Sequence, residues 1–149
     1  MQERKGASAV SLATMQNELS GVNERLRELK TDRENLILFY NQVGSDRGRF
    51  SSQLEGKRTS AKKLYEVDNS NIAQGLATYV AKQLGGKFEG GVGDAFSGMQ
   101  GSISCAIDEI NAEIRSLQTQ ISNLESDIET EKKRLKDEEE AKRHTQEAQ

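Results

Sequence analysis

The sequence contains no proline and no tryptophan, and it has one cysteine and one histidine among its 149 residues. Because proline is the commonest helix breaker, its absence favours long helices. Aromatic residues make up 5% of the chain and hydrophobic residues 34%, which is little for the core of a globular domain of this length. Charged residues make up 30%, which suits solvated helix faces beside a narrow apolar row. The composition therefore predicts elongated helices.

Few residues in the chain could carry chemistry. Cys105 has no second cysteine to form an internal disulfide with, and His144 lies in a polar segment with no orienting partner in view. No His, Cys or carboxylate recurs at a spacing that would converge four metal ligands. A net charge of -3 gives no general attraction to nucleic acid. We therefore expect no enzyme, no catalytic residue, no cofactor, no metal site and no nucleic-acid partner.

Long hydrophobic runs are also missing. No segment reaches the length that spans a bilayer, and residues 6–12 are too short and too rich in serine for the apolar core of a signal peptide. We expect a cytoplasmic protein without membrane insertion, whose export with a partner would use a route without a cleaved leader.

Two heptad rows dominate what is present. Apolar residues recur at alternating spacings of four and three near each end of the chain, and Arg33 and Glu131 interrupt the rows. Such a row buries a narrow stripe against a partner helix, and two rows of nearly equal length are typical of an antiparallel pair. The predicted fold is all-α, a long antiparallel, coiled-coil-like helical hairpin. Its predicted pairing seam consists of Leu12, Met15, Leu19, Val22, Leu26, Leu29, Leu36, Tyr40 and Val43 with Ile103, Ile107, Ile110, Ile114, Leu117, Ile121, Leu124, Ile128 and Leu135.

The rows, the glycines and the charge runs set the expected boundaries. Gly44, Gly48 and Gly56 each disfavour a helix interior, so the first long helix should end near Val43. The helix expected over residues 49–66 is either a separate shorter helix or a bent continuation of the first. We expect a flexible N-terminus over 1–7 and a single helical domain over 8–135. That domain divides into a long helix over 8–43, short helices over about 49–84, a glycine-rich turn over 85–94 and a long helix over 95–135. The charged tail over 136–149 is predicted to be a fraying helix end or disordered.

The register of the hairpin can also be predicted. If the rows pair end to end, Val43 lies near Ile103 and Leu12 lies near Leu135. Arg33 then falls beside Glu113, so the cation in the first row would reach a carboxylate of the second.

The glycine-rich segment does not have the pattern of a phosphate-binding loop. Gly85, Gly86 and Lys87 are followed by Phe88 where such a loop has Ser or Thr, and no strand pattern precedes them. The pattern favours a tight turn, in which glycines let backbones approach and Phe88 and Phe96 anchor the turn to neighbouring helices.

The spacing of Phe88, Gly90 and Phe96 resembles the turn of the WxG-type small helical proteins of type VII secretion, with Phe88 in place of the usual Trp. The longer plan of two heptad rows around a turn is similar to the YwqH-like family associated with LXG-type toxins. The resemblance implies a chaperone-like targeting factor that binds the helical N-terminal domain of such a toxin, in some cases with a second small helical protein. The C-terminal helix lacks the Tyr-x-x-x-Asp/Glu type of export signal, so a partner would have to carry it.

Two classes of function remain open at this stage. A binding partner would use apolar residues outside the rows, and Ile37, Phe39 and Ala106 are the candidates for that face; alternatively these residues cover the middle helices. The second class is a self-assembling coiled-coil structural or filament subunit of a secretion apparatus. A homodimer fits either class, because identical rows can pair between copies as well as within one chain.

Overall fold

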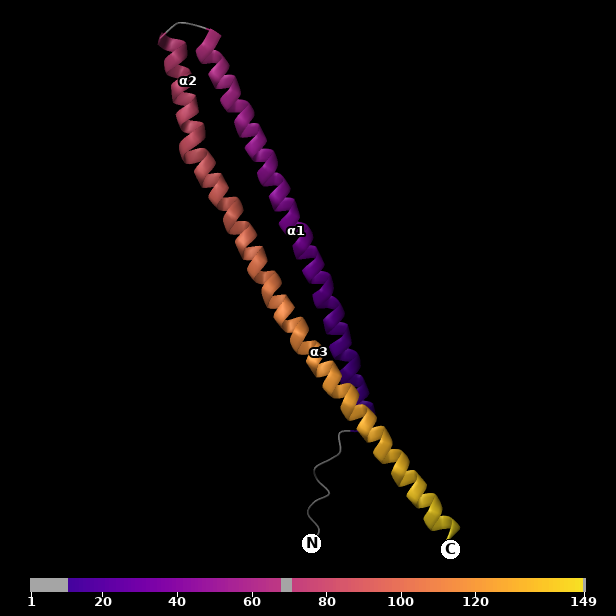
Figure 1. Cartoon of the computed structure of the whole chain (residues 1–149). Helices are drawn as coiled ribbons and strands as arrows, with labels where there is room; N and C mark the ends of the chain where they lie inside the picture. The colour runs from indigo at the N-terminus through magenta and orange to yellow at the C-terminus, as the bar shows by residue number, and fades with distance from the viewer. Residues whose placement is uncertain (1–10, 68–70, 149) are drawn as a thin grey trace, which may run out of the picture. The chain divides into compact units, whose positions relative to one another are not determined.

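The computed structural model describes residues 11–67 and 71–148. Within this part of the chain the elements are α1 (Leu12–Val67), α2 (Asn71–Gln83), a π-helical turn η1 (Leu84–Phe88) and α3 (Glu89–Glu147), with no strand. The two long helices pack antiparallel, with the short helix between them in the sequence (Figure 1). The prediction of an all-α antiparallel hairpin is confirmed.

The start of α1 has a side-chain cap. The hydroxyl of Ser11 accepts a hydrogen bond from the backbone N–H of Thr14 at 3.2 Å, which satisfies one of the donors that a helix start leaves without a partner. The predicted start at Ser8 and the predicted flexible segment 1–7 lie outside the described residues.

The first helix continues past the predicted end at Val43 and runs to Val67 as one element of 56 residues. The glycines that were expected to end it remain helical. A Cβ built on Gly44 would lie 3.3 Å from Nε2 of Gln100, so glycine leaves room for α3 at this point. Farther along, the ring of Phe50 lies 5.7 Å from that of Phe88 and 6.1 Å from that of Phe96. Tertiary packing of this kind outweighs a helix penalty of about 1 kcal/mol per glycine.

The predicted turn over 85–94 is helical, and this corrects the sequence-based boundary. Leu84–Phe88 forms a π-helical turn and Glu89 continues directly into α3. The pair Gly85 and Gly86 does not end the helix, because no described glycine adopts the positive φ of a left-handed C-terminal cap. Phe88 at the end of η1 and Phe96 in α3 both contact the ring of Phe50 of α1, so the two residues are helical and do not flank a turn.

Two compact units make up the described chain. The first combines residues 11–33 with 110–148, and the second comprises residues 34–109. In the first unit the N-terminal part of α1 packs against the C-terminal part of α3, and the buried residues are Leu29, Ile114, Leu124 and Ile128. In the second unit the rest of α1 packs against α2, η1 and the start of α3, and the buried residues are Val43, Leu54, Ala61, Ala77 and Ile103.

The charged tail forms the end of α3, which runs to Glu147. Of the two alternatives, a helix end and disorder, the structure has a helix over residues 136–147. Exposed ion pairs one turn apart link Arg134 with Glu138, Lys136 with Glu140 at 3.9 Å and Arg143 with Glu139 at 2.8 Å. Such exposed pairs stabilise a helix only weakly, because solvent screens them.

Candidate helix-binding surfaces

Most residues of the predicted seam have reduced exposure. The structure buries Leu29, Val43, Ile103, Ile114, Leu124 and Ile128. It half-buries Leu12, Met15, Leu19, Val22, Leu26, Leu36, Ile107, Ile110, Leu117 and Ile121. Tyr40 and Leu135 are exposed, with exposed fractions of 37% and 40%. Leu135 is exposed because it lies in the part of α3, residues 132–147, where every residue is exposed.

The register of the first unit differs from the predicted one. Nη1 of Arg33 donates a hydrogen bond to Oδ1 of Asn111 at 3.3 Å, while Glu113 accepts hydrogen bonds from Nε and Nη2 of Arg25. The predicted pair of Arg33 with Glu113 is therefore wrong. Nε2 of Gln120 likewise donates a hydrogen bond to Oε1 of Glu18 across the two helices, at 3.4 Å.

Glu131, the residue that interrupts the second row, has a side chain that is only 13% exposed. Arg134 holds both of its carboxylate oxygens, with Nε donating to Oε2 at 2.9 Å and Nη2 donating to Oε1 at 2.6 Å. These hydrogen bonds, followed by the charge of Arg134, lower the pKa of Glu131 below its ordinary value, although desolvation opposes them. The charged carboxylate of Glu131 is thus tolerated at a seam position because Arg134, one turn away, donates hydrogen bonds to both of its oxygens.

The second unit contains a section without any charge. Residues 35–45 of α1 and 95–107 of α3 include no Lys, Arg, Asp or Glu, although 30% of the chain is charged. The contact between Gly44 and Gln100 places these two segments beside each other. We call this section the uncharged belt. Glu34 and Asp46 bound it on α1, and Asp94 and Asp108 bound it on α3.

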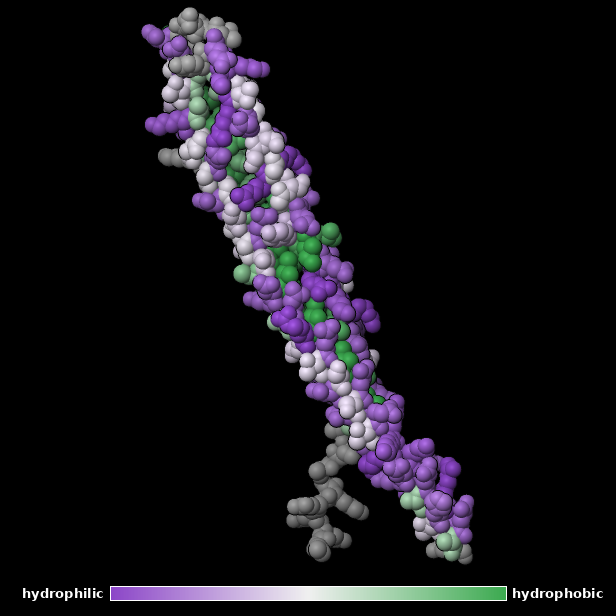
Figure 2. Space-filling model, viewed as in Figure 1, coloured by the Kyte–Doolittle hydropathy of each residue, from purple (hydrophilic) through white to green (hydrophobic). Residues whose placement is uncertain are grey.

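The belt exposes large apolar side chains. The four successive residues Ile37, Leu38, Phe39 and Tyr40 have exposed fractions of 42%, 67%, 51% and 37%. Of the predicted partner face, Ile37 and Phe39 are thus exposed, whereas Ala106 is half-buried. Figure 2 shows hydrophobic side chains gathered on the surface about midway along α1. Consecutive residues point about 100° apart on a helix, so these four side chains cannot all face one seam.

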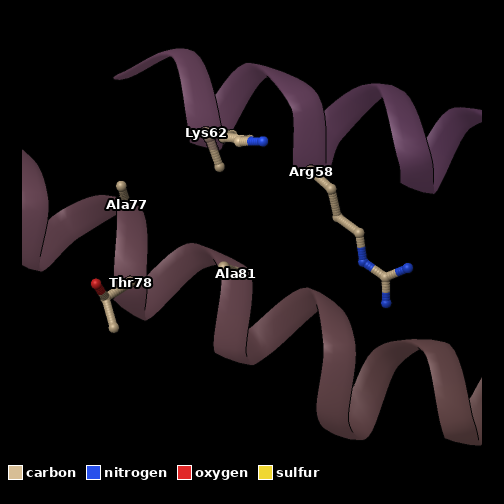
Figure 3. Close-up of a pocket in the computed structure, with 6 residues that line it drawn as sticks. Arg58, Lys62, Ala77, Thr78 and Ala81 are labelled. Carbon is tan, nitrogen blue, oxygen red and sulfur yellow. The ribbon is translucent and has the colours of Figure 1, made fainter. Parts of the chain in front are cut away.

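A second apolar surface lies where α1 packs against α2. Ala61 and Ala77 are buried between the helices, and a groove runs along each side of this contact. The groove in Figure 3, of about 280 Å³, is lined by Arg58 and Lys62 of α1 and by Ala77, Thr78 and Ala81 of α2. The opposite groove, of about 350 Å³, is lined by Lys57, Ser60, Ala61, Leu76, Ala77, Val80 and Leu84.

Sequence reasoning missed two features of these surfaces. Leu38 and Tyr40 were not assigned to a partner face, although the runs without charge over 35–45 and 95–107 are visible in the sequence. Ile72, Leu76 and Tyr79 of α2 are exposed by 85%, 53% and 61%. The sequence pattern places these residues on one face of the helix, but it does not show that this face is wider than the contact with α1 and stays exposed.

The structure contains no arrangement typical of a metal centre in the described residues, because no three His, Cys, Asp or Glu side chains converge. None of the helices within residues 11–67 and 71–148 combines the length and hydropathy of a membrane span. No family model, no curated protein and no solved structure matches the chain.

Proposed function

We propose that this protein acts without catalysis, as a chaperone-like partner whose uncharged belt binds a helix of a second protein. The single observation that carries the proposal is the run from Ile37 to Tyr40, where four large apolar side chains are exposed in a section without charge. Contiguous exposed apolar surface is typical of a protein interaction site. A helix laid along α1 at the belt would cover part of this surface by helix–helix packing.

For the partner we propose the helical N-terminal domain of an LXG-type toxin of type VII secretion. The antiparallel hairpin agrees with the architecture of the YwqH-like proteins that the heptad rows resemble. The motif from Phe88 to Phe96 does not support this identity as a turn, because those residues are helical. The proposal therefore rests on the belt and the hairpin.

The test is calorimetric titration of this protein with the purified helical N-terminal domain of an LXG-type toxin from the same genome. The double variant Leu38→Gln with Phe39→Gln removes exposed apolar area from the belt and should weaken binding at least tenfold. Leu135→Gln is the matched control, because it alters an exposed apolar residue outside the belt and should change the affinity less than twofold. Circular dichroism should show the same helix content for all three proteins.

Two outcomes would contradict the proposal. One is a toxin domain that does not bind, and the other is binding that the belt variant and the Leu135 control weaken equally. Open-ended polymers of the lone protein, measured by light scattering, would instead support the alternative function of a self-assembling coiled-coil subunit.

A further inference from the structure

The apolar surface of α2 is displaced to one side of its contact with α1. Counting about 100° per residue from the buried Ala77, one side of α2 carries apolar side chains and the other side is small or polar. The apolar side consists of Ile72, Leu76, Tyr79 and Val80, continued by Leu84 at the start of η1, and the opposite side includes Thr78 and Ala81. Val80 and Leu84 are half-buried, while Ile72, Leu76 and Tyr79 are exposed. The face thus extends from the α1 contact to solvent.

The groove of about 350 Å³ lies on this apolar side of α2. Lys57, Ser60 and Ala61 of α1 form one wall, and Leu76 and Val80 contribute to the other. From Ile72 to Leu84 the apolar face is about 18 Å long, which matches about three turns of a helix. A groove between two helices with apolar walls is the shape that a third, amphipathic helix fills.

Among the described residues that line this groove, the charged one is Lys57, and it is exposed. The carboxylates of Glu55 and Glu89 both pair with Arg58, which lines the groove on the other side of the Ala61 and Ala77 contact. A bound helix would gain from acidic residues at its border with Lys57.

We propose that the groove between Lys57 and Leu76 is a second docking site, which binds an amphipathic helix of another protein that carries Asp or Glu along the edge of its apolar stripe. The site is separate from the uncharged belt, because Lys57 lies about 25 Å beyond Tyr40 along α1. It therefore stands or fails independently of the function proposed for the belt.

The test measures fluorescence anisotropy of two labelled synthetic peptides with the full chain. Both peptides are 18-residue helices with leucines at positions i, i+3, i+4 and i+7, and the leucine stripe is bordered by Glu in one and by Lys in the other. The Glu-bordered peptide should bind at least tenfold more tightly, and 0.5 M NaCl should reduce this difference by screening. Leu76→Gln and Lys57→Glu should each weaken its binding at least fivefold.

Lys62→Glu is the matched control, since Lys62 lines the groove on the other side of the Ala61 and Ala77 contact. It makes the same change of charge and should weaken binding less than twofold. Equal effects of Lys57→Glu and Lys62→Glu would overturn the proposal, because they would indicate attraction to the basic surface in general. Equal binding of the two peptides, or no binding of the Glu-bordered peptide, would also overturn it. So would binding of phosphatidylglycerol vesicles that both lysine variants weaken equally, because that outcome assigns the surface to a membrane.

Discussion

Arg25 of α1 and Glu113 of α3 are joined across the first unit by two hydrogen bonds, with Nε and Nη2 of the guanidinium each 3.3 Å from the same carboxylate oxygen. The hydrogen bonds and the charge of Glu113 raise the pKa of Arg25, with a smaller effect from Glu28. Both side chains are about half exposed, so solvent screens the pair. The pair therefore indicates which parts of the two helices lie beside each other, but it contributes little to their stability.

A double-mutant cycle with Arg25→Ala and Glu113→Ala should give a small favourable coupling that decreases as NaCl is raised. The same cycle with Arg33→Ala and Glu113→Ala should give no coupling within error, because Arg33 contacts Asn111. Urea unfolding followed by circular dichroism provides the measurement. A larger coupling for Arg33 than for Arg25 would contradict the register described above.

Ile114 is 5% exposed in the core of the first unit, so Ile114→Ala should remove about 2 to 4 kcal/mol of unfolding free energy. Leu38→Ala is a matched control at a residue that is 67% exposed, and its effect should stay within about 0.5 kcal/mol. Equal effects in urea unfolding would show that Ile114 is not a seam residue in solution.

Two glycines of α1 differ in the space around them. A Cβ on Gly48 meets nothing within 4 Å, so Gly48→Ala should stabilise the protein by about 0.5 to 1 kcal/mol through helix propensity. A Cβ on Gly44 would lie 3.3 Å from Gln100, so Gly44→Ala should gain less than Gly48→Ala. The comparison uses thermal melting. A greater gain at Gly44 would show that α1 and α3 are farther apart there than the structure has them.

Glu131 links stability to pH. Arg134 lowers the pKa of the folded carboxyl below its ordinary value of 4.5, so the folded state binds this proton less readily than the unfolded chain. Its contribution to stability is thus present above about pH 4.5 and is lost as pH falls through the folded pKa. Melting temperatures between pH 7 and pH 3 should fall less steeply for Glu131→Gln than for the wild type. Parallel curves would show that the carboxylate is not held by Arg134.

The sequence predicted the two-helix pairing because the heptad rows are long enough to define the buried stripe. It left open whether the helix after Gly44 and Gly48 is separate or a continuation of the first, since the penalty of a glycine is local whereas the packing that offsets it is tertiary. Phe50 contacts Phe88 and Phe96 from a distant part of the chain, and no local rule contains that contact. The partner of Arg33 was also misjudged, because alignment of row ends does not determine which polar groups meet.

The central claim is that the two rows pair within one chain and leave the belt uncovered. The most direct measurement is the distance between two nitroxide labels, determined by pulsed electron paramagnetic resonance. One label is attached to the native Cys105 and the other to the variant Asn41→Cys, and both positions are exposed. The axes of packed helices lie about 10 Å apart, so the labels should lie within about 30 Å. That distance should remain when labelled protein is diluted into an excess of unlabelled protein. A distance beyond about 50 Å, or a short distance that disappears on dilution, would contradict pairing within one chain.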